Sequence, residues 1–345
     1  MSGGPDLPGG AEPGRVTVDV CLTPEDLQAA LRRDARRGLT SVPKAMPPVW
    51  FYDDRGCELY EQITRTPEYY PFRTERALLQ AAGPAIAAIS AASVLVELGS
   101  GTSEKTRLLL GAMAAGPAGL GGYVPMDVAE PTLRAAAGSV AAELGVDVHA
   151  VVGDFREHLD RLPAPAAPRR LVAFLGSTVG NLLPAERARF LADVAALLGP
   201  DDAFLLATDL VKPVERLIAA YDDAGGVTAA FDRNLLSVLN RELGADFEVH
   251  RFAHRAVWDA DNRWIEMRLV ATEAMTVKVP ELDLVVDFAA GEEVRTEVSA
   301  KFTPEGTTRE LGHAGLAVAA TWTDPAGDYL LTLARRGGAG PPGGG

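Results

Sequence analysis

Short apolar runs alternate with amphipathic stretches through the middle of the chain. Each run has the length of a buried strand, and the stretch after it repeats apolar positions at helical spacing. The predicted strands are Val94–Leu98, Gly122–Asp127, Val146–Val152, Arg170–Leu175 and Ala203–Asp209. Strands that alternate with helices are typical of a parallel sheet covered on both faces. We therefore predict a Rossmann-like α/β fold, in which ligands bind at the carboxyl ends of the strands.

The pattern differs on either side of this region. Before it, helical spacing appears at 23–37, 57–64 and 74–89. After Asp209, two more helical stretches precede segments in which apolar and polar residues alternate, such as 263–270. Alternation of this kind predicts strands with one buried face, and so an inserted α+β module. A helix and two strands then return the chain to the parallel sheet as a terminal hairpin, at 304–314, 316–322 and 329–334.

Composition narrows the range of partners. The formal net charge is −14, and an acidic surface repels phosphate backbones and anionic lipids. No apolar run reaches the ~18 residues that a membrane helix needs, and no secretory signal is visible at the N-terminus. Cys21 and Cys57 lack the C-x-x-C spacing of redox or metal motifs. We therefore expect a cytoplasmic protein that binds neither nucleic acid nor membrane.

A glycine-rich turn follows the first predicted strand of the sheet, as Glu97-Leu98-Gly99-Ser100-Gly101. Glycines at a strand-to-helix turn let the backbone approach a ligand closely. A dinucleotide motif would need Gly or Ala where Glu104 stands, and no G-K-[ST] follows as in a phosphate-binding loop. A tight turn without a ligand remains an alternative. Among ligands, the motif favours S-adenosylmethionine.

Acidic residues at the ends of the next two strands strengthen this interpretation. Asp127 ends one strand, where its carboxylate can accept hydrogen bonds from both ribose hydroxyls. Asp154 follows the other strand, where it can accept from the adenine amino group while Phe155 supplies apolar contact. Each aspartate taken alone could instead cap a loop. Three such features after three successive strands predict a site for the methyl donor.

Longer segments carry a closer resemblance. They include Pro67-Glu68-Tyr69-Tyr70-Pro71, the stretch from Phe174 to Asn181, and Thr296-Glu297-Val298-Ser299. From about Leu31 to Arg335 the chain resembles the L-histidine Nα-methyltransferases, which make the trimethylated betaine hercynine in the first step of ergothioneine biosynthesis.

The resemblance implies a role for each matching residue. S-adenosylmethionine would be held by Gly99, Lys105, Asp127, Asp154 and Phe155. Tyr69, Asn181 and Tyr221 would bind the carboxylate and backbone end of histidine. Glu297 and Ser299 would bind the imidazole ring, with Val298 between them and Met267 lining the same pocket. Tyr52 would lie near the α-amino group and accept or relay its proton. The family needs no metal.

We expect a monomer that acts on a small-molecule substrate. The resemblance also implies how the chain is divided into domains. The predicted regions are a disordered N-terminus at 1–14, a substrate-binding domain at 15–73 and 211–301, a methyltransferase domain at 74–210 and 302–336, and a disordered Gly/Pro tail at 337–345.

Other interpretations of these residues stay open at this point. Glu297 could be a solvated strand residue, and Asn181 could cap the helix that follows it. His250 and His254 are spaced as metal ligands on a helix, but their context is strand-like and no third ligand lies near in sequence. The alternative functions are a related methyltransferase that acts on another amino acid or small amine, and a catalytically inactive ligand-binding protein with the same fold.

Overall fold

The computed structural model describes residues 14–164 and 169–337. The disorder predicted for the first thirteen residues and the last eight lies outside the described residues. Gly14 and Gly337, which border them, take part in the fold, because their backbone N–H groups donate to Ala141 (3.1 Å) and Gly315 (2.7 Å).

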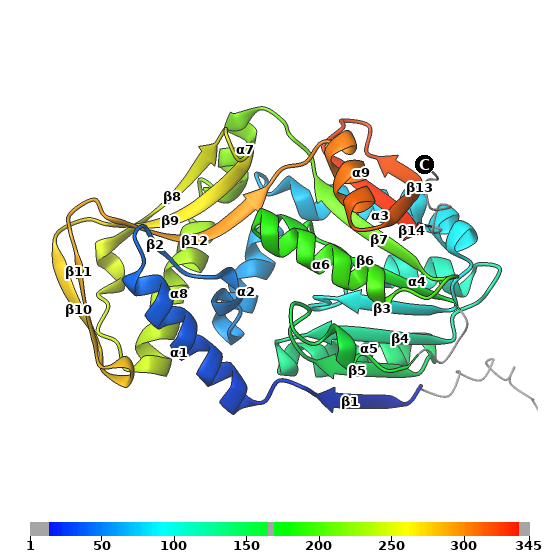
Figure 1. Ribbon diagram of the computed structural model, residues 1–345, viewed down its shortest axis with the longest axis horizontal. Coiled ribbons are helices and arrows are strands. Elements are labelled where there is room, and N and C mark those ends of the chain that lie inside the picture. The colour runs from blue at the N-terminus through cyan, green and yellow to red at the C-terminus, as the bar shows by residue number, and fades with distance from the viewer. Residues whose placement is uncertain (1–13, 165–168, 338–345) are drawn as a thin grey trace, which may run out of the picture.

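An eight-stranded sheet forms the larger part of the molecule, in the order β1-β5-β4-β3-β6-β7-β14-β13 (Figure 1). Its parallel centre is the predicted set of strands, each matched to within two residues. The strands are β3 (Val94–Leu98), β4 (Gly122–Asp127), β5 (Val148–Val152), β6 (Arg170–Phe174) and β7 (Ala203–Asp209). The hairpin of β13 (Leu316–Thr323) and β14 (Tyr329–Arg336) pairs antiparallel with β7. The predicted Rossmann-like sheet with a terminal hairpin is confirmed.

The first strand corrects one predicted boundary. Strand β1 (Val16–Val20) pairs in parallel with β5 at the edge of the large sheet. The prediction that assigned all of 15–73 to the substrate-binding domain is therefore wrong for these residues. The strand is five residues long and mostly exposed, so its apolar pattern alone does not distinguish it from a loop.

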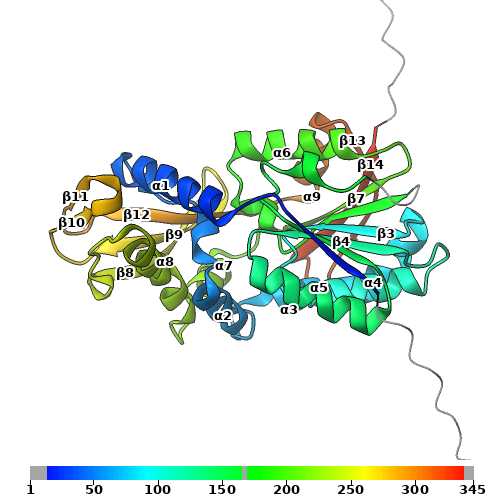
Figure 2. The same cartoon turned by 90° about the horizontal axis from the view of Figure 1, so that it is seen from below.

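Helices cover both faces of this sheet (Figure 2). Helices α3 (Tyr70–Ser90), α4 (Thr106–Ala114) and α5 (Glu130–Leu144) pack on one face, and α6 (Pro184–Leu197) and α9 (Pro304–His313) on the other. Successive strand residues point to opposite faces. Leu95 accordingly joins the core beneath α3, while Val96 joins the core beneath α6. Since both faces are buried, the strands are largely apolar.

A second, smaller unit lies beside the carboxyl ends of the parallel strands (Figure 1). Its sheet has the order β2-β12-β9-β8, and a separate hairpin joins β10 to β11. The strands are β2 (Lys44–Ala45), β8 (Phe252–Asp259), β9 (Trp264–Ala271), β10 (Met275–Val279), β11 (Leu284–Phe288) and β12 (Glu293–Ala300). The helices are α1 (Pro24–Thr40), α2 (Asp54–Ile63), α7 (Val214–Tyr221) and α8 (Val227–Leu243).

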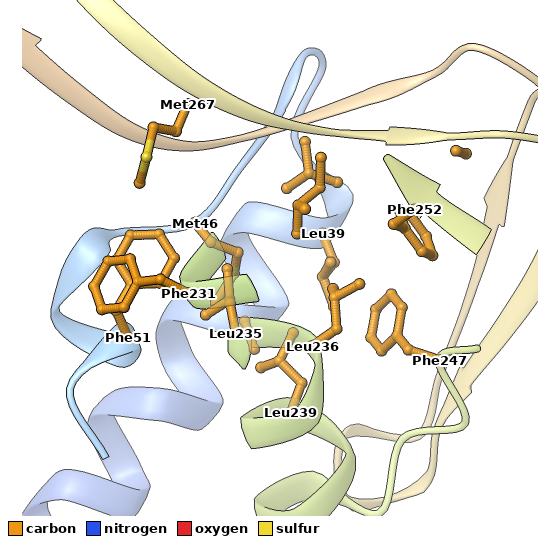
Figure 3. Packing of buried hydrophobic residues seen from close by; sticks show 14 of the residues in the cluster. Leu39, Met46, Phe51, Phe231, Leu235, Leu236, Leu239, Phe247, Phe252 and Met267 are labelled. Carbon is orange, nitrogen blue, oxygen red and sulfur yellow. The ribbon is translucent and has the colours of Figure 1, made fainter. Parts of the chain in front are cut away.

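Two segments far apart in sequence share the core of this smaller unit. Leu39 and Phe51 from the N-terminal segment pack with Phe231 and Leu235 of α8 (Figure 3). The rings of Phe51 and Phe231 lie 4.6 Å apart between centroids. Burying each such side chain stabilises the fold by roughly 1.5–3 kcal/mol. The N-terminal segment and the insertion therefore fold as one body, which supports the proposed two-part domain apart from β1.

Candidate active site

A cleft with ≈ 520 Å³ of empty space, part of it open to solvent, lies where the smaller unit meets the carboxyl ends of the large sheet. Seven of the eight residues predicted for catalysis and substrate binding line it, together with Tyr60, Gly176, Thr178 and Phe231 among others. The seven are Tyr52, Tyr69, Asn181, Tyr221, Met267, Glu297 and Ser299.

The geometry of β12 decides which of its residues reach the cleft. Its pairing with β9 shifts by one residue between Arg295 and Glu297, leaving a bulge at Thr296. A bulge reverses the alternation of side chains beyond it. Val294 before the bulge packs in the core of the smaller unit, whereas Val298 beyond it packs against the large sheet. Glu297 and Ser299 consequently face the cleft together.

Val298 therefore differs from its predicted role. Its side chain is 5 % exposed and lies in the core shared with the large sheet, away from the cleft lining. Only its backbone reaches the site, where its carbonyl oxygen accepts a hydrogen bond from Asn181 Nδ2 at 2.7 Å. Val298 orients Asn181 through this bond.

Asn181, at the end of the 3₁₀ turn η3 (Thr178–Asn181), also donates from Nδ2 to Glu297 Oε1 at 3.0 Å. Burial raises the pKa of the Glu297 carboxyl to about 7, because Lys301 and the bond from Asn181 only partly offset the loss of water. Glu297 can thus gain or lose its proton near neutral pH, and its carboxylate accepts hydrogen bonds from the cleft side.

Beside Glu297, the cleft is lined by the hydroxyl groups of Tyr221 and Ser299. Tyr221, the last residue of α7, places its Oη 2.7 Å from Ser299 Oγ. Lys301 Nζ donates to both oxygens, at 2.9 Å each. It also pairs with Asp209 Oδ2 at 2.9 Å, at the end of β7. None of the predictions included Lys301 or Asp209 as site residues, although Lys301 stands two positions after Ser299.

Aromatic side chains form the wall opposite β12. Tyr52 follows the 3₁₀ turn η1 (Pro48–Phe51), and its ring meets that of Tyr60 edge-on at 5.9 Å. Tyr69 precedes α3, and its ring centroid lies 6.4 Å from that of Tyr60 and 6.2 Å from that of Tyr221. Desolvation of the hydroxyl raises the pKa of Tyr52 well above its usual value, and Tyr60 and Glu297 add to this effect. Tyr52 is therefore a neutral phenol that can accept or donate one hydrogen bond at a time.

The donor edge, which we define as Gly99, Lys105, Asp127, Asp154 and Phe155, lies at the ends of β3, β4 and β5 and the start of α4. Gly99 has φ +69°, a conformation that favours glycine. Asp127 accepts from Gly101 N at 2.8 Å through one oxygen and from Ala129 N at 2.9 Å through the other. Each oxygen keeps a lone pair, so Asp127 can accept from two further hydroxyls.

Lys105 connects the donor edge to the cleft. Its ammonium forms an ion pair with the buried carboxylate of Glu75, which also accepts from Gly176 N at 2.7 Å. Desolvation alone would lower the pKa of Lys105, but the charge of Glu75, that of Tyr60 and the hydrogen bond to Glu75 together outweigh it, and the pKa is raised. Lys105 is therefore a fixed positive charge beside the cleft residue Gly176.

Asp154 and Phe155 follow β5, and Asp154 has a partner within the chain. The Asp154 carboxylate is already held by the Arg156 guanidinium, with a shortest distance of 2.6 Å, and by Arg156 N at 2.8 Å. Part of its capacity to accept from a ligand is therefore used within the chain. The Phe155 ring packs edge-on against Phe174 at 4.9 Å and lies 3.8 Å from where a Cβ at Gly99 would stand.

His250 and His254 do not share a site. His254 lies in β8, where Nδ1 is 2.7 Å from Asp232 Oδ2 and Nε2 is 2.8 Å from the Tyr221 carbonyl oxygen. Both of its ring nitrogens are thus engaged, and His250 lies in the preceding 3₁₀ turn. Within 14–164 and 169–337, no group of three or more His, Cys, Asp or Glu side chains is placed to hold a metal ion.

Comparison with known proteins identifies the family. The model of the S-adenosylmethionine-dependent, histidine-specific methyltransferases matches residues 31–336. The chain belongs to this family. It is 55 % identical to the histidine N-alpha-methyltransferase of Mycolicibacterium smegmatis, over 91 % of this chain and 98 % of that protein. It is 51 % identical to the enzyme of the same name from Mycobacterium tuberculosis, over 93 % of this chain and 100 % of that protein.

A more distant relative also matches most of this chain. The ergothioneine biosynthesis protein 1 of Neurospora crassa is 27 % identical over 93 % of this chain and 36 % of that longer protein. The predicted family, fold class and methyl donor are confirmed. In the part of the chain that the structure describes, no helix is both long and apolar enough to cross a membrane.

Proposed function

We propose that this enzyme transfers three methyl groups in turn from S-adenosylmethionine to the α-amino nitrogen of L-histidine. The product is hercynine, and the reaction is the first step of ergothioneine biosynthesis. The observation that carries the proposal is the bulge in β12, which turns Glu297 and Ser299 to the same cleft as Asn181 and Tyr221. The cleft thereby joins ring-binding groups to groups that suit an amino-acid backbone.

The imidazole ring pairs with the first set of groups. A neutral imidazole has one N–H and one bare ring nitrogen. Glu297 accepts from the N–H, and the hydroxyl of Ser299 serves the other nitrogen. Asn181 and Tyr221, with Tyr69, bind the carboxylate and amino end, where the atoms are common to all amino acids.

The donor edge holds S-adenosylmethionine. The two free lone pairs of Asp127 match the two ribose hydroxyls, and Lys105 supplies a positive charge for the donor's carboxylate. Phe155 offers an apolar surface to the adenine, and Asp154 shares its oxygens between Arg156 and the adenine amino group. The glycine turn at Gly99 leaves room for the ligand to approach the backbone.

The methyl transfer is an in-line displacement. The lone pair of the neutral amine attacks the methyl carbon, the carbon–sulfur bond breaks, and its electrons remain on sulfur as a thioether. The nitrogen becomes cationic and must lose a proton before the next transfer, and the third transfer leaves a quaternary nitrogen. The protein therefore has to align the reactants and keep the amine neutral. Tyr52, whose phenol lines the cleft, can relay the amine proton.

Mass spectrometry of the products tests the proposal. Histidine incubated with the enzyme and S-adenosylmethionine should gain one, two and finally three methyl groups, with one equivalent of S-adenosylhomocysteine per methyl. Phenylalanine under the same conditions is the control and should stay largely unmodified. Equal methylation of both amino acids would disprove the histidine specificity, and absence of any methylated product would disprove the activity.

We further propose that the enzyme works as a monomer in the cytoplasm on this small-molecule substrate. Cys21 and Cys57 are both free thiols, which fits a reducing compartment. Light scattering coupled to gel filtration tests the monomer, since a particle of twice the chain mass would contradict it.

A further inference from the structure

Lys301 lies in the contact between the two units and is the centre of a buried polar cluster. We define this cluster as Lys301, Asp209, Ser299, Tyr221, Tyr70 and Lys212. The side chains of Lys301 and Asp209 are 0 % and 1 % exposed. Lys301 follows β12 of the smaller unit, and Asp209 ends β7 of the large sheet. A buried charge pair of this kind costs free energy unless every donor is used, so its contacts are informative.

All three N–H donors of Lys301 have partners. They are Tyr221 Oη and Ser299 Oγ at 2.9 Å each, and Asp209 Oδ2 at 2.9 Å. Asp209 is fixed in turn by Tyr70 Oη, at 2.7 Å, and by Lys212. Because an ammonium group has no acceptor, both hydroxyl oxygens must accept from Lys301.

The number of hydroxyl hydrogens determines whether this pair donates or accepts a hydrogen bond on the cleft side. Tyr221 and Ser299 have one hydroxyl hydrogen each, and they lie 2.7 Å apart. One hydrogen lies between the two oxygens, and the other remains. Since Lys301 occupies one lone pair on each oxygen, the remaining hydrogen has to point away from the lysine, toward the cleft. The pair is thereby a hydrogen-bond donor to whatever binds there.

We propose that Lys301 is a positioning residue that makes the Ser299–Tyr221 pair a donor. Next to the acceptor Glu297, this arrangement selects a ligand ring with one N–H and one bare nitrogen, which is a neutral imidazole. Lys301 touches no substrate atom and acts through the two hydroxyls. The inference rests on the proposed function, because it assigns the ring to this face of the cleft.

The test replaces Lys301 by methionine, which has similar length and no donor. The KM for histidine should rise about 10- to 100-fold, because the hydroxyl pair loses its fixed direction. The kcat should fall much less, and the Kd for S-adenosylmethionine should stay within about twofold, because neither depends on this pair. A merely structural role would instead lower the fraction of active enzyme, reducing kcat at unchanged KM.

Lys212→Met is the matched control. Lys212 is also buried and pairs with the same Asp209 carboxylate, but it contacts neither Ser299 nor Tyr221. It should leave the KM for histidine unchanged. If both lysine variants raised this KM equally, the effect would come from the charge balance of Asp209 and the proposal would be wrong.

A double-mutant cycle with Ser299→Ala shows whether Lys301 acts through the hydroxyl. The KM increase of the double variant should be clearly smaller than the product of the two single increases. A full product would overturn the proposal. If Lys301→Met does not fold, Asp209→Asn/Lys301→Met removes both charges and should show the same increase in KM. Wild-type turnover of histidine is measured first, so that a failure of the proposed function is seen separately.

Discussion

The donor edge is built at the ends of neighbouring strands of one parallel sheet, whereas the cleft gathers side chains from many separate places in the chain. Gly99, Asp127 and Asp154 lie at the carboxyl ends of β3, β4 and β5, which are neighbours in the sheet. Glu297 and Asn181 are 116 residues apart in sequence yet lie 3.0 Å apart. The donor edge therefore depends on local turns, and the cleft depends on how the two units pack.

The two sites also differ in which groups hold their polar side chains in place. Asp127 takes its internal hydrogen bonds from backbone N–H groups, so its environment is built by the turn itself. Glu297, Ser299 and Tyr221 are held by side chains, namely Asn181 and Lys301. Side-chain networks act as a unit, so single changes in the cleft should spread to neighbours, while changes at the donor edge should stay local.

Asp127→Ala should have the largest effect. We expect S-adenosylmethionine binding to weaken by ~2–4 kcal/mol, because two ribose hydroxyls lose a charged acceptor. Asp154→Ala is the comparison variant and should weaken binding less, because Arg156 already occupies part of that carboxylate. Isothermal titration calorimetry measures both. Near wild-type affinity in Asp127→Ala would remove this residue from the donor edge.

Glu297→Ala should lower the affinity for histidine by ~1.5–3 kcal/mol and leave donor binding nearly intact. A site built around buried polar groups can reject a ligand without the partner group by up to ~10⁴-fold, so this variant should also lose preference for histidine over phenylalanine. The readout is kcat/KM for both amino acids. Unchanged histidine turnover would show that Glu297 does not bind the ring.

Asn181→Ala should cost about 1–2 kcal/mol for every amino-acid substrate tested, because it serves atoms that all amino acids share. The ratio of kcat/KM for histidine to that for phenylalanine should therefore move less than in Glu297→Ala. A comparable loss of preference in both variants would mean that Asn181 acts mainly by orienting Glu297, to which it donates.

The smallest expected effect is a change in stability, which Glu297→Gln should produce. The pKa of Glu297 is raised from 4.5 to about 7 in the folded protein. The folded state thus binds this proton more tightly than the unfolded state, and stability falls as pH rises from 4.5 to about 7. Glutamine does not titrate, so the stability of the Glu297→Gln variant does not fall in this way as pH rises. Its free energy of unfolding should exceed that of the wild type by on the order of 1 kcal/mol above this range.

Denaturant unfolding at several pH values measures this difference. The advantage of Glu297→Gln should be small at the acidic end and grow toward neutral pH. A difference that does not change with pH would mean that the substitution acts through packing or hydrogen bonding instead of through the titration of Glu297.

The sequence by itself determined the parallel sheet and the donor edge. Apolar runs of strand length, such as Val94–Leu98, are long enough to be recognised, and their ends are marked by Gly99 and Asp127. Parallel strands bring their carboxyl ends to one edge, so residues that follow successive strands lie near one another. The resemblance to histidine methyltransferases indicated which residues line the cleft, but not how they are arranged.

Only the tertiary structure decided how that set is arranged. Simple alternation along β12 does not reveal the bulge at Thr296, which separates the face of Val294 from that of Val298. The sequence pattern also does not indicate that Lys301 contacts Tyr221 and Asp209, which belong to other elements. Nor does it indicate that β1 joins the large sheet. Each of these features depends on contacts between residues far apart in sequence, which local pattern does not record.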